Sequence, residues 1–104
     1  MNSASLEIRL AALAAAGKTA GYGALARDLG LRMAELTAAL ERLMEVDAAA
    51  GRPLRAALCA GRLSGGLPAR GFFDKAASLG FDISDPAALA ESHRRALHAA
   101  PPAT

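Results

Sequence analysis

Residues 22–50, with the sequence YGALARDLGLRMAELTAALERLMEVDAAA, contain two helical patterns that are separated by a short turn. The first pattern runs from Gly23 to Leu29 and the second from about Met33 to Ala50, with Gly30–Arg32 between them. Two helices joined by a glycine-containing turn of about three residues indicate a helix-turn-helix. Apolar residues recur at helical spacing and are expected to face inward: Leu25, Ala26 and Leu29 in the first helix, then Met33, Leu36, Leu40, Leu43 and Met44 in the second.

A further helix is expected before this pair. Ser3 or Ser5 can cap its first turn, and Gly17 fits its C-terminal end. Its apolar stripe consists of Leu6, Leu10 and Leu13. Residues 19–22 are expected to form a small strand or an extended link.

The segment that follows the pair is irregular and rich in glycine and arginine: residues 48–73, AAAGRPLRAALCAGRLSGGLPARGFF. Leu54–Ala60 is expected to be one strand, and Gly61–Gly66 the turn after it. A short return strand near Leu67–Arg70 is restricted to an edge position, because Pro68 cannot donate a ladder hydrogen bond. We therefore predict an α+β, mostly helical fold: a winged helix-turn-helix with a small β-hairpin wing and additional C-terminal helices.

Two helices are predicted in the C-terminal part of the chain. Gly71 opens the first, and Gly80 closes it. Asp85 is expected to cap the last helix, which runs from Pro86 to about Ala99. Residues 1–100 are expected to form a single domain and residues 101–104 a frayed tail, since 104 residues suit one domain.

The composition limits the classes of protein to consider. No apolar run reaches the ~18 residues that a membrane span needs, and the N-terminus MNSASLEIRL has no secretory signal pattern. A single cysteine makes no internal disulfide. A cytoplasmic protein without a membrane partner is expected.

Charge is segregated along the chain, although the net charge is only +2. Residues 33–47 carry four acids and one arginine, whereas residues 48–73 carry four arginines and no acid. The acids are expected to lie on the solvated side of their helix: Glu35, Glu41, Glu45 and Asp47. Arginines near glycine-rich turns suit phosphate, because backbone N–H groups and guanidinium groups can both approach it. The candidate nucleic-acid-binding residues are therefore Arg52, Arg55, Arg62 and Arg70, and the alternative is that they pair with the acidic helix.

No catalytic residue, cofactor or metal is predicted, and the protein is not expected to be an enzyme. GKT at residues 17–19 lacks the earlier glycine of a phosphate-binding loop, because position 12 is Ala, and it follows a helix. Cys59 has no nearby base in the sequence, so a buried apolar role is expected. His93 is expected in the core or at an interface, and it is five residues from His98, which does not suit a shared metal.

Two resemblances to known families add to this interpretation. The residues Gly17-Lys18-Thr19, Tyr22-Gly23 and Leu25-Ala26 resemble the entry to the helix-turn-helix of O6-alkylguanine alkyltransferases and alkyltransferase-like proteins, over about residues 17–43. The resemblance implies a related fold but not repair activity. The reactive Pro-Cys-His-Arg motif is missing around Cys59, and no arginine occurs at Ala34–Leu36, where that family inserts one into the base stack.

The second resemblance is to small uncharacterised bacterial proteins with a GRPL…GLPxxGFFxxAxxLG signature, which here spans residues 51–80. This resemblance implies a single domain and indicates no particular activity. The leading hypothesis is a non-enzymatic winged-helix module that contacts duplex DNA through the wing, weakly and with strong salt dependence. The alternative is a protein-interaction or dimerisation module, in which a basic wing docks on the acidic helix of a second copy.

Overall fold

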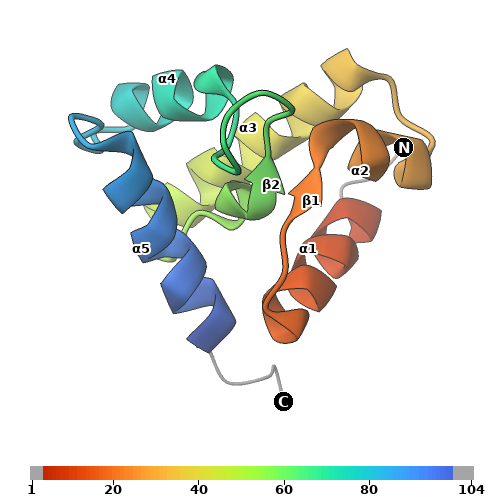
Figure 1. The fold of residues 1–104 in the computed structure, drawn as a ribbon, viewed down its shortest axis with the longest axis horizontal. Coiled ribbons are helices and arrows are strands. Elements are labelled where there is room, and N and C mark those ends of the chain that lie inside the picture. Colours follow the sequence, from red (N-terminus) through yellow and green to blue (C-terminus); the bar gives the residue numbers. More distant parts are fainter. Residues whose placement is uncertain (1–3, 100–104) are drawn as a thin grey trace.

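The computed structural model describes residues 4–99, and it is α+β and mostly helical (Figure 1). Its elements, in order, are α1 (Ala4–Ala16), β1 (Ala20–Gly21), α2 (Tyr22–Leu29), α3 (Met33–Ala49), the 3₁₀ helix η1 (Arg55–Leu58), β2 (Cys59–Ala60), α4 (Arg70–Ser78) and α5 (Pro86–Ala99). Among the described residues, no helix has the length and apolar character needed to cross a membrane. Ser3, as a possible cap, and the expected tail at residues 101–104 lie outside the described residues.

The turn between α2 and α3 has a local cause. Gly30 adopts a positive φ of 67°, and its N–H donates to the Arg27 carbonyl while the Leu31 N–H donates to Ala26. These two bonds close α2 in the manner of a glycine-terminated helix. Helix α3 then begins at once, because the Arg32 N–H donates to the Glu35 carboxylate at 2.8 Å. The predicted pair of helices and its turn are confirmed.

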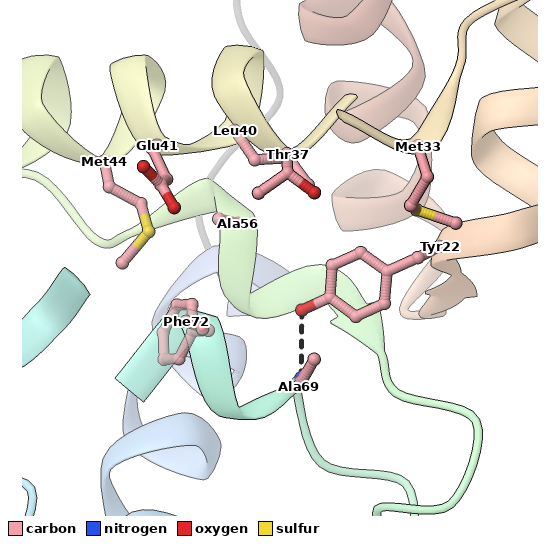
Figure 2. Close-up of a pocket in the computed structure, with 10 residues that line it drawn as sticks. Tyr22, Met33, Thr37, Leu40, Glu41, Met44, Ala56, Ala69 and Phe72 are labelled. Carbon is pink, nitrogen blue, oxygen red and sulfur yellow. Dashed lines mark hydrogen bonds between the residues drawn. The ribbon is translucent and has the colours of Figure 1, made fainter. Parts of the chain in front are cut away.

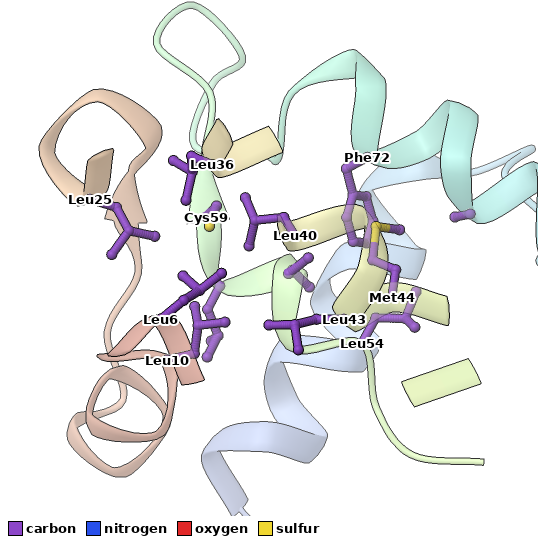
Figure 3. Close-up of a cluster of buried hydrophobic side chains, with 14 of the residues drawn as sticks. Leu6, Leu10, Leu25, Leu36, Leu40, Leu43, Met44, Leu54, Cys59 and Phe72 are labelled. Carbon is purple, nitrogen blue, oxygen red and sulfur yellow. The ribbon is translucent and has the colours of Figure 1, made fainter. Parts of the chain in front are cut away.

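The first part of the segment that was expected to form the wing, Leu54–Ala60, lies instead at the centre of the core (Figure 3). Residues 56–59 are buried without a break, and η1 contacts α1, α3 and α5. Around it pack the buried side chains of the helices: Leu6, Leu10, Leu25, Leu36, Leu40, Leu43, Met44 and Phe72. This central segment joins the N-terminal and C-terminal helices into one core.

The β-hairpin wing is therefore a wrong prediction. Strand β2 pairs with β1, and the pairing is parallel, with Ala20 opposite Cys59 and Gly21 opposite Ala60. The expected strand over Leu54–Ala60 is mostly 3₁₀ helix, and the expected return strand is absent from the described chain, where α4 starts at Arg70. The physical reason is that the residues of η1 and β2 are buried on every side. A hairpin on the surface would leave about half of these residues in water, whereas small alanines let η1 approach three helices closely.

Other sequence expectations differ less from the structure. Leu6, Leu10, Leu25 and the α3 stripe from Leu36 to Met44 are buried, as predicted, but Met33 is 49% exposed. The predicted cap of α5 is confirmed, because the Asp85 carboxylate accepts a hydrogen bond from the Ala88 N–H at 3.1 Å.

Candidate binding groove between helices α3 and α4

The four candidate arginines do not share one location. Arg55 is mostly buried and lies against Asp47: its Nη2 is 2.8 Å from Oδ1, and its Nε and backbone N–H also donate to this carboxylate. Its Nη1 is 3.1 Å from the Glu7 carboxylate on α1. Arg52 lies 3.4 Å from the Asp47 Oδ1 on the outer side. Two of the four arginines are thus engaged by one acid, as the alternative interpretation anticipated.

The expectation that Asp47 lies on the solvated side of its helix is wrong, because the side chain is fully buried. It lies in the last turns of α3, and its position faces η1 rather than water. A buried carboxylate must be paired and hydrogen-bonded, and Arg55 meets both needs. The hydrogen bond to Asp47 is the main cause that raises the pKa of Arg55. This network stabilises the fold by connecting α3, η1 and α1.

Arg62 lies in a closed loop, Gly61–Leu67, and Arg70 is the first residue of α4, three residues after it. The loop is closed at its base, since the Gly61 N–H donates to the Leu67 carbonyl at 2.7 Å. A Cβ on Gly61 would lie 3.2 Å from the Ala69 Cα, so the two chain segments almost touch there. Both arginines are exposed, and Arg70 lies 3.9 Å from the Asp74 carboxylate, one turn along α4. The structure therefore brings these two candidate residues to one region and leaves the other two elsewhere.

A groove of about 260 Å³ lies beside this loop, between α3 and the start of α4 (Figure 2). Its lining comes from α2, α3, η1 and α4: Tyr22, Met33, Thr37, Leu40, Glu41, Met44, Ala56, Ala69, Gly71 and Phe72. Sequence reasoning missed this groove because four separate segments supply its walls. Met33, which was expected to face inward, instead lies at one end of the groove and is 49% exposed.

The Tyr22 side chain fixes one wall of the groove. Its hydroxyl oxygen accepts a hydrogen bond from the Ala69 N–H at 3.0 Å, which Figure 2 marks. Burial raises the pKa of Tyr22, so the phenol stays neutral. This bond holds the start of α4 against the start of α2, and it sets the position of the loop base at the edge of the groove.

Glu41 is the charged residue of the groove. It is half-buried on α3, and it has no hydrogen bond or ion pair to any residue between 4 and 99. The other glutamates of α3 are paired: Glu35 with Arg32, and Glu45 with Lys75 at 2.6 Å. These partners lower the pKa of both carboxyls. Glu41 is therefore the carboxylate on α3 that is left without a cation, and it lines an otherwise largely apolar groove (Figure 2).

Cys59 and His93 lie outside the groove. Cys59 is buried, as predicted, and burial raises the pKa of its thiol to about 12. His93 accepts a hydrogen bond at Nδ1 from the Leu54 N–H at 2.9 Å, and burial lowers its pKa. The core position that was expected for His93 is thus a contact between α5 and the central segment. No group of three metal-ligating side chains occurs between residues 4 and 99.

Comparison with known proteins gave no match to a family model, to a curated protein or to a solved structure.

Proposed function

We propose that this protein is a non-enzymatic binding module, and that its groove receives a polypeptide segment with a basic side chain next to an apolar one. The observation that carries this proposal is the Glu41 carboxylate, which lies among apolar side chains and has no partner among residues 4–99. A carboxylate in partly apolar surroundings gains most from a hydrogen-bonded cation. A lysine or arginine of a partner would supply that cation.

The remaining groove residues suit an apolar neighbour of this cation. Phe72, Leu40 and Met44 give an apolar wall. Methionine side chains adapt to different shapes, which is why they are frequent on protein-binding surfaces. The lining holds no cysteine, serine, lysine or histidine, so it offers none of the usual nucleophile–base pairs. Binding, and not covalent chemistry, is therefore the function that we propose for the groove.

Two small probes of opposite charge test this proposal. We expect 4-phenylbutylamine to shift the amide NMR signals of Thr37, Glu41 and Gly71, and 4-phenylbutyrate to leave them unchanged. Glu41→Gln keeps the shape but removes the charge, and should weaken amine binding about 10-fold, because a hydrogen bond to a charged group is worth ~1.5 kcal/mol or more. Glu35→Gln, which alters an exposed acid outside the groove, is the control. Equal shifts with both probes, or none, would contradict the proposal.

A second candidate is contact with duplex nucleic acid, supported by the exposed Arg62 and Arg70 on either side of the loop base. It would place the chain among winged helix-turn-helix proteins, with the loop Gly61–Leu67 in place of a hairpin. The helix pair α2 and α3 has the short turn of that class. Arg52 and Arg55 take no part in this candidate, because both are engaged by Asp47.

Fluorescence anisotropy with a labelled duplex tests this second candidate. Binding is expected at about 50 mM salt and should be largely lost at about 200 mM, as phosphate contacts require. Arg62→Ala and Arg70→Ala should each weaken it, whereas Arg95→Ala, on the exposed side of α5, should not. No binding at the lower salt concentration would rule the candidate out.

A further inference from the structure

The loop Gly61–Leu67 presents an apolar side chain that the fold leaves fully uncovered. Leu63 is 96% exposed, which is the largest value among the exposed large apolar residues of the described chain. Arg62 stands next to it and is also exposed. Gly65 and Gly66 both have positive φ, and the Leu67 N–H donates to the Ser64 carbonyl, so the turn is tight. A tight, internally bonded loop loses little conformational freedom when it binds.

The groove is complementary to this loop in chemistry. It has apolar walls at Leu40, Met44 and Phe72, and its carboxylate, Glu41, is paired with no residue in the described part of the chain. The loop tip has one apolar side chain, Leu63, with a cation beside it. A single exposed leucine is common on protein surfaces, but Leu63 is paired with a neighbouring cation, and the groove has the matching apolar and acidic groups. The groove thus offers apolar cover for Leu63 and a carboxylate for Arg62.

We propose that the groove is occupied by the loop of a second copy of this chain, with Leu63 on the apolar walls and Arg62 on the partner's Glu41. This inference rests on the proposed function of the groove, and it names the occupant. Within one chain the loop does not reach the groove, because Leu63 remains exposed. The loop base lies at the groove edge, since Ala69, which lines the groove, lies against Gly61 at the loop base.

This placement suits a two-fold symmetric dimer. A two-fold axis repeats every contact, so that a loop and a groove that lie side by side on one face can each engage the other copy. Two loops would then enter two grooves, and both copies of Glu41 would be neutralised. The two contacts are identical, so a change to one residue acts twice in the dimer.

A charge exchange tests the pairing. Arg62→Glu places two acids together at both contacts of its own dimer, and Glu41→Arg places two arginines together. Each variant alone should therefore dimerise at least about tenfold more weakly than the parent chain. In an equal mixture of the two variants, both contacts again join a Glu and an Arg, and a heterodimer should form with about the parent affinity. Sedimentation velocity, from about 10 µM to about 1 mM, gives the masses.

Leu63→Ser tests the apolar part of the contact, and Ile8→Ser is its matched control. Ile8 is 69% exposed on α1 and lies outside the groove and the loop. We expect Leu63→Ser to weaken dimerisation about tenfold or more, and Ile8→Ser to leave it unchanged. Circular dichroism of each variant establishes that it is folded.

The outcomes separate this inference from the proposed function. A parent chain that stays monomeric throughout, single variants that dimerise like the parent, or a mixture that does not associate would each overturn the dimer. If the groove still binds phenylbutylamine in those cases, the proposed function stands and only the occupant is wrong. If neither the amine nor a second copy binds, both proposals fail.

Discussion

Asp47 is the one charged side chain that the described part of the chain buries completely, and its surroundings explain how this is tolerated. Arg55 donates to it from its backbone and from its side chain. Breaking a buried pair leaves a charge that is neither solvated nor compensated, which costs more than the pair itself contributes. The network is therefore a stability feature that lies at the junction of the acidic and basic segments.

We expect Asp47→Ala to lower the free energy of unfolding by about 3 kcal/mol, the low end of the range for a broken buried pair, because Arg55 keeps some contact with water and with Glu7. Chemical denaturation measures this value. Arg52→Ala removes only the outer, half-exposed partner and should cost about 1 kcal/mol or less. Equal losses for the two variants would show that Arg55 does not depend on Asp47.

At the scale of the elements, a side-chain hydrogen bond links the start of α2 to the residue before α4. The Tyr22 hydroxyl accepts from the Ala69 N–H just before α4 begins. The Ala69 amide lies beside the loop base, and it would be left without this partner if the hydroxyl were removed. The position of the loop base, and with it the edge of the groove, therefore depends on Tyr22.

Tyr22→Phe should lower the free energy of unfolding by about 1–2 kcal/mol, because it leaves a partly buried N–H unsatisfied. Hydrogen exchange at the Ala69 amide should accelerate more than exchange in α1, since the loss is local. Ser78→Ala removes an exposed hydroxyl that bonds within α4 and serves as the control. Unchanged exchange at Ala69 would contradict this role of Tyr22.

The helices could be predicted from the sequence because their signals are local. Gly30 and Asp85 lie at helix boundaries for reasons that involve only a few neighbouring residues. The η1 segment could not be predicted in this way. Alternation along Leu54–Ala60 suggests two faces, but three helices and β1 cover it from different directions. Its conformation follows from packing that no local pattern encodes.

At the scale of the whole molecule, the candidate site was also only partly predictable. Arg62 and Arg70 were found from composition, whereas the groove was not, because residues from α2, α3, η1 and α4 meet only in the folded chain. The segregated charge had an internal explanation: Asp47, at the end of the acidic stretch, engages Arg52 and Arg55. Charge totals alone do not distinguish such a pair from a free basic surface.

The free energy of unfolding should fall as the pH decreases below about 6.5, the ordinary pKa of histidine. The neutral His93 accepts the Leu54 N–H, and burial lowers its pKa from 6.5, so the folded state binds a proton less readily than the unfolded state does. The neutral His93 contributes its full stabilisation above its pKa in the unfolded state. This stabilisation decreases as the pH falls from that value toward the lower pKa of the folded state. Denaturation at several pH values measures this slope. His93→Gln should flatten the slope, and the control His98→Gln should not.

The parallel pairing of β1 with β2 has a consequence for how the chain reaches its structure. Each strand has two residues, and the chain between them includes helices α2 and α3. Closing so long a loop for so few ladder bonds is entropically unfavourable unless the intervening helices are already in place. The pairing is therefore expected to form late in folding, after α2 and α3 have packed. Because its two strands are far apart in the sequence, it should lower the folding rate of a chain that is otherwise rich in local contacts.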